Sequence, residues 1–427
     1  MPTHTSLPFT RRRLLSGTGG ALALGAAPSL LTATPAAAQG AGGAPAPLKM
    51  PKLYAPTERE GSDPLLPSPP AERVGFAVVG LGRLTLEEIL PALGACKHAK
   101  LSALVSGSPD KMRAAADRYG VPQAGLYDYA GFDRIRDNRD VQVVYIVLPN
   151  SMHREFTERA ARAGKHVLSE KPMATNVADA EAMVRACAAA NVKLMVAYRM
   201  QYEPHLREVI RLARSGELGR VKSFTSENCQ TQGDPAQWRL KRALAGGGAL
   251  PDIGIYCLNT VRAVLGEEPV EVSARIHSTP GDPRFAEVEE AMAFTLAFPS
   301  GAIANCFTSY DVHNSRRLRV GLSDGLIDMD PAYSYEGQRL RVERKGGEKI
   351  ESADERRLQA KNQFALEMDH MALCVKRDLR PHTPGEEGVQ DQRLMEALYA
   401  SARENRPVRL DPVPGRDPFR GPPPQEG

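Results

Sequence analysis

The feature that most constrains this chain is a short apolar run that ends in a glycine turn and leads into a helix. Residues 74–79 read Val-Gly-Phe-Ala-Val-Val, which predicts a buried strand, and Gly80-Leu81-Gly82-Arg83-Leu84 follows directly. The first glycine permits a tight turn, and the second lets the backbone approach a pyrophosphate at the helix N-terminus. Alone, such a glycine pair is as often an ordinary turn. Between a strand and a helix it predicts a dinucleotide-binding loop.

Short apolar runs alternate with helical stretches over the next 120 or so residues, a pattern typical of a parallel sheet. We expect a doubly wound dinucleotide-binding domain of the Rossmann type over residues 74–197. The predicted strands are 74–79, 100–105, 141–148, 166–169 and 193–197, and the predicted helices are 86–94, 109–119, 152–163 and 178–190.

Strands dominate the rest of the chain, with a hairpin turn at 299–301. Alternating apolar and polar residues favour a mostly antiparallel sheet that is open on one face and covered by helices on the other. We expect residues 198–427 to form this α+β domain for substrate binding and oligomerisation. Its predicted strands are 221–227, 269–277, 291–298, 302–310, 317–322 and 339–343, and its closing helices are 364–377 and 392–404.

The N-terminus is typical of an export signal. Three arginines, 11–13, precede a weakly apolar run at 17–34 and a small-residue cleavage site at Ala38. Pro28 and several glycines interrupt the run, so a membrane anchor is not expected and a twin-arginine signal fits best. We expect residues 1–38 to direct the folded protein to the periplasm. Residues 39–73 are proline-rich and are either a passive spacer or an arm laid over a neighbouring subunit or the cofactor.

Charge and cysteine content exclude several other classes of protein. The formal net charge of +4 falls close to zero without the signal arginines, so a nucleic-acid partner is not expected. The six cysteines show no CxxC pair and no zinc-like pairing with histidines. We therefore expect free buried thiols and no metal site.

The end of the second predicted strand favours NADP over NAD. An NAD-selective site usually has an acid there to bind the ribose 2′-hydroxyl. Here Ser106 follows the strand, and the first acid is Asp110. Ser106, Lys111 and Arg83 could instead bind a 2′-phosphate. The alternative is that Lys111 and Arg83 are ordinary solvated helix charges.

Two further strand ends place polar residues at the edge of the sheet where doubly wound folds bind ligands. Leu148-Pro149-Asn150 and His153 follow one strand, and Glu170-Lys171 follows the next. We expect the first group to contact the cofactor, although Ser151 can also simply cap a helix. A lysine in the second position can bind a substrate hydroxyl and lower the pKa of an acid-base partner. A surface ion pair with Glu170 would explain it equally well.

A glycine-rich loop at 246–248 leads into a helix that carries polar residues. Asp252, Tyr256 and Asn259 stand at i, i+4 and i+7, which predicts a carboxylate, a phenol and an amide on one helix face. Asp252 could merely complement the helix dipole. The adjacent glycine loop favours a ligand site, because it lets the backbone approach closely.

Taken together, these motifs resemble the family of glucose-fructose oxidoreductase and inositol dehydrogenase, in particular its glucose-fructose oxidoreductase branch. The resemblance runs from about residue 73 to about residue 409. It rests on the segments 80–82, 104–107, 127–129, 147–151, 164–167, 170–175, 234–240, 252–256 and 384–388.

The resemblance implies a catalytic group of Lys171, Asp252 and Tyr256, with Tyr256 as the acid-base. It implies that Ser106 and Lys111 bind the 2′-phosphate of a tightly bound NADP. Trp238 and Arg239 would close over the nicotinamide. The other implied cofactor contacts are Tyr129, Pro149, Asn150, His153, Glu170 and Arg199.

The resemblance also implies the reaction. An aldose such as glucose would be oxidised to its lactone and a ketose such as fructose reduced to a polyol, sorbitol, with the NADP recycled internally. A free tyrosine has a pKa of about 10, so Tyr256 needs a neighbour such as Lys171 to favour phenolate. The family likeness further implies a homo-oligomer, a dimer or tetramer, whose arm wraps a partner subunit and shields the cofactor.

Two kinds of alternative remain open. The chain could be an exported NADP-dependent aldose dehydrogenase or an aldose-aldose oxidoreductase with the same fold and residues. It could also be a non-catalytic sugar-binding or sensor protein, although the presence of both Lys171 and Tyr256 argues against this.

Overall fold

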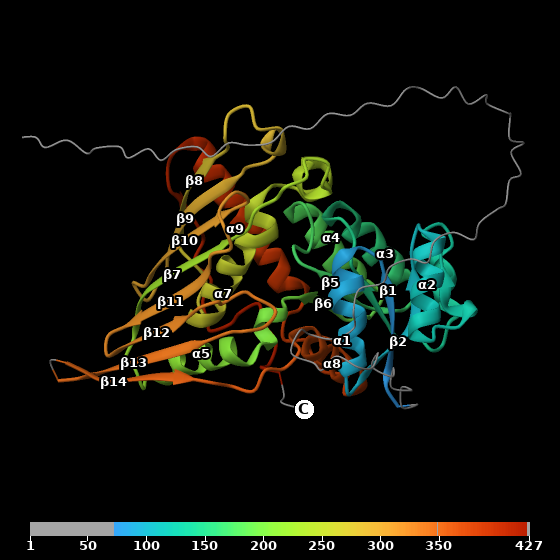
Figure 1. Ribbon diagram of the computed structural model, residues 1–427, viewed down its shortest axis with the longest axis horizontal. Helices are drawn as coiled ribbons and strands as arrows, with labels where there is room; N and C mark the ends of the chain where they lie inside the picture. Colours follow the sequence, from blue (N-terminus) through green and yellow to red (C-terminus); the bar gives the residue numbers. More distant parts are fainter. Residues whose placement is uncertain (1–71, 348, 425–427) are drawn as a thin grey trace, which may run out of the picture. The chain divides into compact units, whose positions relative to one another are not determined.

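The parallel sheet expected from residue 74 onward is confirmed in the computed structural model, which describes residues 72–347 and 349–424 (Figure 1). It has six strands in the order β3-β2-β1-β4-β5-β6, and each neighbouring pair is parallel. The order reverses between β1 and β4, where sheets of this type bind ligands. The strands are β1 (Val74–Val79), β2 (Ala99–Val105), β3 (Leu126–Tyr127), β4 (Val143–Ile146), β5 (His166–Glu170) and β6 (Leu194–Ala197).

The helix after the glycine turn differs from the prediction of one helix over 86–94. A π-helix covers Thr85–Ile89 and α1 begins only at Leu90. Pro91 has no N–H, and its ring would clash with the carbonyl of Glu87 in a continuous α-helix, which accounts for the wider turn. The helices of this half are α1 (Leu90–Ala95), α2 (Pro109–Tyr119), α3 (His153–Arg162) and α4 (Val177–Ala189).

The second sheet has nine strands and is mostly antiparallel, as expected; the β7–β10 pair is parallel. The order is β14-β13-β12-β11-β7-β10-β9-β8-β15. The sequence prediction lacked β12, β14 and β15. The strands are β7 (Val221–Cys229), β8 (Glu271–His277), β9 (Ala291–Ala297), β10 (Ile303–Ser309), β11 (Arg316–Leu322), β12 (Gly325–Met329), β13 (Leu340–Gly346), β14 (Lys349–Arg356) and β15 (Val408–Arg409).

Helices cover one face of the second sheet and connect it to the first. Helix α7 packs on β7 and β10, and α9 packs on β8 while also contacting α4 and β6 (Figure 1). A continuous hydrophobic core therefore runs from the first sheet to the second. The remaining helices are α5 (Pro204–Ser215), α6 (Arg242–Ala245), α7 (Ile255–Leu265), α8 (Gln363–Lys376) and α9 (Gly385–Glu404).

Helix α8 returns to the parallel sheet although it lies late in the chain. Its residues Phe364, Met368 and Met371 belong to the same apolar cluster as Phe76 and Leu104. It lies beside α1 in Figure 1 and contacts that helix. A helix from the predicted second domain thus helps to cover the dinucleotide-binding sheet.

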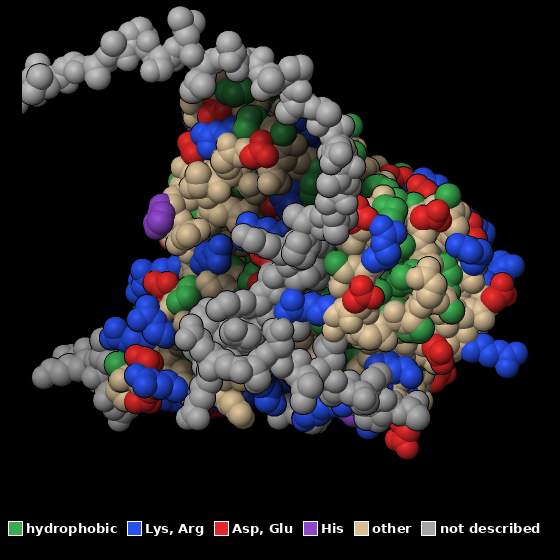
Figure 2. Space-filling model, turned by 45° about the vertical axis from the view of Figure 1, so that its right-hand side comes forward, with side chains coloured by type: hydrophobic (Ala, Val, Ile, Leu, Met, Phe, Trp, Pro, Cys, Tyr) green, Lys and Arg blue, Asp and Glu red, His purple; other side chains and the backbone are tan. Residues whose placement is uncertain are grey.

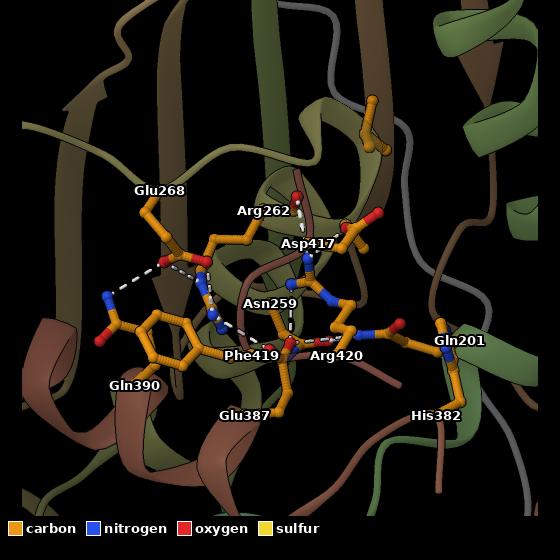
Figure 3. Close-up of polar contacts among 12 residues, drawn as sticks. Gln201, Asn259, Arg262, Glu268, His382, Glu387, Gln390, Asp417, Phe419 and Arg420 are labelled. Carbon is orange, nitrogen blue, oxygen red and sulfur yellow. Dashed lines mark hydrogen bonds and ion pairs between the residues drawn. The ribbon is translucent and has the colours of Figure 1, made fainter. Parts of the chain in front are cut away.

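A buried ion cluster holds α7 against α9 (Figure 3). Arg262 of α7 is fully buried and lies 2.8 Å from Glu268 and 3.0 Å from Glu387, with Asp391 as its third partner. Arg420, near the C-terminus, binds Glu387 at 2.7 Å. Because α7 also carries Tyr256, this cluster fixes the helix that presents a candidate catalytic residue.

Several expectations concern residues or surfaces that lie beyond this core. The predicted signal, 1–38, and all but the last two residues of the predicted arm, 39–73, lie outside the described residues. No helix in the described part of the chain is long and apolar enough to cross a membrane. The six cysteines are free and buried, as expected. Within residues 72–347 and 349–424 no group of three potential metal ligands comes together.

The face of the molecule in Figure 2 carries acidic and basic side chains side by side over the dinucleotide-binding half. No continuous basic surface is visible over the described residues of that half. The expectation that no nucleic acid binds stays a prediction.

Candidate active site

The three residues predicted to be catalytic lie together. Lys171 follows β5, and Asp252 lies in a π-helix (Leu250–Gly254) that leads into α7. The Lys171 Nζ donates to the backbone oxygen of Asp252 at 2.5 Å and lies 3.4 Å from its Oδ1. The same nitrogen is 4.7 Å from the centre of the Tyr256 ring. The carboxyl edge of the parallel sheet thus meets the start of α7 at a lysine, a carboxylate and a phenol.

Asp252 is held as a carboxylate by its neighbours. Its Oδ2 accepts a hydrogen bond from the Tyr310 hydroxyl at 2.8 Å and lies 3.3 Å from the Arg239 Nε. Burial alone would raise the pKa of Asp252, but the charges of Arg239 and Lys171 outweigh it and lower that pKa. Asp252 therefore orients two cations. Tyr310 was missed in the sequence, where it is merely the last residue of a predicted strand.

The Tyr256 hydroxyl meets a second cation. It accepts a hydrogen bond of 3.0 Å from the Nε of Arg199, which follows β6. The sequence placed Arg199 along the cofactor. In the structure its guanidinium donates to protein groups, including the backbone oxygen of Tyr333 at 2.8 Å.

Behind Lys171, two buried glutamates share one tyrosine. The Tyr145 hydroxyl lies 2.8 Å from Glu170 and 3.2 Å from Glu367 of α8. The phenol has a single proton, which these two carboxyl groups share or compete for. Burial raises the pKa of Glu367, and the neighbouring Glu170 raises it further. Both carboxyl groups are buried, and burial also raises the pKa of Glu170.

The glycine turn has the space that a bound dinucleotide requires. Gly80 has a φ of +96°, and a Cβ there would lie 2.2 Å from the Val147 oxygen. A Cβ on Gly82 would meet nothing within 4 Å. Thr85, at the third glycine position of the motif, is buried and donates to the Gly80 oxygen at 2.6 Å. The turn is therefore rigid beneath Gly80 and open above Gly82, which fits a pyrophosphate.

The loops around this turn are held by predicted cofactor residues. The His153 ring nitrogens lie 2.9 Å from the Leu148 oxygen and 3.0 Å from the Pro172 oxygen, which joins the loops after β4 and β5. Asn150 donates to the Ala245 oxygen at 2.8 Å. These hydrogen bonds fix the loops beside the glycine turn, and contact with a cofactor stays a prediction for both residues.

The predicted phosphate-binding residues differ in exposure. Ser106 is buried, and its hydroxyl accepts from the Ser108 N–H at 3.1 Å. Lys111, on α2, is exposed, and so is Arg83, which pairs with Glu87 at 2.7 Å. Both side chains are therefore accessible to a charged ligand at this edge, although Arg83 is already paired with Glu87.

The remaining predicted residues divide between the site and the interior. Tyr129 packs against Gly107 next to Ser106. The Arg239 guanidinium, which pairs with Asp252, lies 4.5 Å from the centre of the Trp238 ring. Asn259 is bound elsewhere: its amide nitrogen donates to Glu387 at 2.8 Å and to Asp391 at 2.9 Å in the buried ion cluster. Its side chain therefore bonds to carboxylates of α9 rather than to the catalytic candidates.

Comparison with known proteins agrees with this geometry. Residues 74–198 match an oxidoreductase family with an NAD-binding Rossmann fold, and residues 206–328 match the GFO/IDH/MocA C-terminal domain. The chain belongs to the GFO/IDH/MocA oxidoreductase family. It is therefore an oxidoreductase, as the sequence predicted.

Three similar proteins illustrate the range of this GFO/IDH/MocA family. The structure of the aldose-aldose oxidoreductase from Caulobacter crescentus, complexed with glycerol, is 48% identical, with a TM-score of 0.77, and the match covers 79% of this chain and all of that one. D-xylose 1-dehydrogenase [NADP(+)] of Haloarcula marismortui is 34% identical over 79% of this chain and 93% of its own length. A dTDP-3,4-didehydro-2,6-dideoxy-alpha-D-glucose 3-reductase of Streptomyces violaceoruber is 32% identical over 72% of this chain and 86% of its own.

Substitutions at the two glycines should separate folding from cofactor binding in this family member. Gly80→Ala is expected to destabilise the fold by about 1–3 kcal/mol, because the alanine would have a positive φ and clash with Val147. Gly82→Ala should leave the thermal midpoint unchanged and weaken dinucleotide binding, measured by titration. Equal losses of stability in the two variants, or undiminished binding by Gly82→Ala, would contradict this interpretation.

Proposed function

We propose that this protein is an NADP-dependent sugar oxidoreductase that oxidises an aldose at C1 and reduces a second sugar with the same tightly bound NADP. The observation that carries this proposal is the contact of Lys171 with Asp252 and its position 4.7 Å from the Tyr256 ring, at the edge of a dinucleotide-binding sheet. The NADP-dependent xylose dehydrogenase among its relatives supports both the cofactor and the aldose.

The second sugar is proposed to be another aldose. The 48% identity with an aldose-aldose oxidoreductase over that protein's full length favours this acceptor. Fructose, which the glucose-fructose oxidoreductase motifs favour, is the second candidate. Both candidate reactions use the same proposed catalytic residues of this chain and differ in the sugar that is reduced.

Residues of this chain would transfer the proton and orient the substrate. NADP, when bound, accepts a hydride from one sugar and donates it to the next. Tyr256 removes the proton of the C1 hydroxyl and later returns a proton to the second sugar. Lys171 donates a hydrogen bond to the reacting oxygen, while Asp252 holds its ammonium in place through the 3.4 Å ion pair. Gly80, Gly82, Ser106 and Lys111 would hold the pyrophosphate and the 2′-phosphate.

Export to the periplasm through the twin-arginine pathway is part of the proposal and rests on residues 1–38. Soluble nicotinamide cofactor is scarce outside the cytoplasm, so an exported oxidoreductase benefits from a cofactor that stays bound and is regenerated by the second sugar. A homo-oligomer remains a prediction, as does an arm at 39–73 that shields the cofactor.

The decisive experiment uses the protein purified without added cofactor. A denatured sample is analysed for released NADP, and the native protein is given glucose alone, glucose with a second aldose, and glucose with fructose. We expect NADP and a polyol from one of the mixtures. Absence of bound nucleotide would refute tight binding. Sorbitol from fructose, established by isotopic labelling, would favour the second candidate.

Lys111 allows a test of the cofactor preference. Lys111→Ala should weaken NADP binding about tenfold and leave NAD binding unchanged, because one exposed cation would no longer meet the 2′-phosphate. Titration of cofactor-free protein with each dinucleotide measures the ratio. Arg113→Ala, on the same helix and paired with Asp110, serves as the control. An equal loss of affinity for NAD and NADP would show that Lys111 does not contact the 2′-phosphate.

A further inference from the structure

Arg199 is a buried cation without a direct carboxylate partner in the part of the chain that the structure describes. It is 5% exposed. Its donors go to the Tyr256 hydroxyl, the Tyr333 backbone oxygen, the Met200 sulfur and the amide oxygen of Gln363. Burial of a charge is expensive unless an opposite charge accompanies it. Tyr256 is the one ionisable group among these four partners.

The position of the guanidinium is tightly fixed. Its carbon lies 4.7 Å from the ring centres of both Tyr256 and Tyr335 and 5.8 Å from that of Phe364. Gln363 is in turn bound to the Tyr335 backbone oxygen at 2.6 Å. Helix α8 and the segment after β12 thus hold Arg199 against the phenol.

Lys171 is situated differently from Arg199. Its Nζ is bound to the Asp252 backbone oxygen and lies within ion-pair distance of the Asp252 carboxylate, so its charge is largely balanced. It approaches the ring of Tyr256, and its hydrogen bonds go to Asp252 and not to the Tyr256 hydroxyl. Of the two cations, only Arg199 donates to the oxygen that must lose and regain a proton.

We propose that Arg199 is the positioning residue that governs protonation of Tyr256. Lys171, which is held by its ion pair with Asp252, instead donates a hydrogen bond to the substrate oxygen. The inference rests on the proposed function, in which Tyr256 is the acid-base. An ionised Tyr256 completes the ion pair that Arg199 otherwise lacks, and Arg199 therefore favours phenolate. When Tyr256 is protonated, Arg199 still orients its oxygen, leaving the phenol proton directed elsewhere.

Other titratable groups face this pair and must be separated from it. Glu170, at the end of β5, and Glu367, on α8, both interact electrostatically with Arg199. Glu88 faces it from the π-helix after the glycine turn, and burial raises the pKa of Glu88 to about 7. The Tyr335 ring centre lies 4.7 Å from the guanidinium carbon. Glu88→Gln is therefore a necessary control for any pH effect.

The test compares variants that remove the charge with variants that retain it. Arg199→Gln and Arg199→Met remove it, Arg199→Lys retains it, and Gln363→Leu removes a neighbour but leaves the cation. Two quantities are measured: the pH dependence of kcat for aldose oxidation, and the ultraviolet absorbance of tyrosinate in sugar-free protein. Subtraction of the same titration in Tyr256→Phe isolates the signal of Tyr256.

Loss of the charge is expected to move both midpoints upward by about 1–2 pH units and to lower kcat at neutral pH about 10- to 100-fold, with KM little changed. Arg199→Lys and Gln363→Leu should shift the midpoints less, and Glu88→Gln should leave the absorbance midpoint in place. Thermal unfolding verifies that each variant folds. If Arg199→Gln does not fold, Arg199→Met is used in its place, because methionine packs better among apolar side chains.

Unmoved midpoints in Arg199→Gln and Arg199→Met would overturn the proposal. So would a shift in Arg199→Lys or Gln363→Leu as large as that in Arg199→Gln, since this would indicate loosened packing rather than lost charge. If the parent protein oxidises no aldose, the proposed function fails, whereas the absorbance titration still decides the role of Arg199.

Discussion

Tyr256→Phe is expected to lower kcat for aldose oxidation by about 10²- to 10⁴-fold at neutral pH, the range typical of a lost general acid-base. The ring would still pack beside Tyr333, whose ring centre is 5.7 Å away, so folding should not change. Only the oxygen that accepts from Arg199 would be lost. Lys171→Ala should cause a loss of similar size, because the Asp252 carboxylate would then have no ammonium to direct at the substrate.

Single-turnover kinetics and the amount of NADP retained after purification measure the two effects separately. Both variants should keep their NADP while turnover is lost. Tyr335→Phe is a matched control, since its ring centre lies at the same 4.7 Å from the Arg199 guanidinium carbon as that of Tyr256. Its kcat should stay within a few-fold of the parent value. Retained activity in both Tyr256→Phe and Lys171→Ala would remove these residues from the chemistry.

The parallel sheet could be predicted because its strands are buried on both faces and appear as unbroken apolar runs. The second sheet was harder to predict at its edge. Strand β14 (Lys349–Arg356) reads Lys-Ile-Glu-Ser-Ala-Asp-Glu-Arg and pairs with β13 alone, so no apolar alternation marks it. Helix α8 showed its helical pattern, but nothing in the sequence indicated that it would pack on the first sheet.

The candidate site shows the same division. Lys171 and Asp252 could be brought together from the sequence because each belongs to a local motif at a predicted strand or helix end. The hydrogen bond from Tyr310 to Asp252 spans 58 residues, and that from Arg199 to Tyr256 spans 57. Such pairs depend on how the two sheets are joined, and neither partner carries a local signal for it. Asn259 shows the converse, a residue with suggestive spacing that the α9 carboxylates bind instead.

The buried ion cluster should be the most sensitive point of the fold outside the active site. Arg262→Met is expected to lower the free energy of unfolding by about 3–5 kcal/mol, the range found when one partner of a buried pair is removed. The variant leaves Glu268, Glu387 and Asp391 buried with Arg420 as the nearest remaining cation (Figure 3). Denaturant unfolding of the cofactor-loaded protein measures the loss.

The loss should depend on pH in a defined direction. Burial already raises the pKa of Asp391 to about 6 in spite of Arg262, and removal of Arg262 can only favour protonation further. At pH 5 the carboxyl groups that have lost Arg262 can become neutral. The loss of free energy of unfolding should therefore be smaller at pH 5 than at pH 8. Arg211→Met, whose arginine is half-exposed and paired with Glu208 and Glu217, should cost at most about 1 kcal/mol at either pH. A loss in Arg262→Met that matched this control, or that grew as pH fell, would show that the cluster does not stabilise the fold by charge pairing.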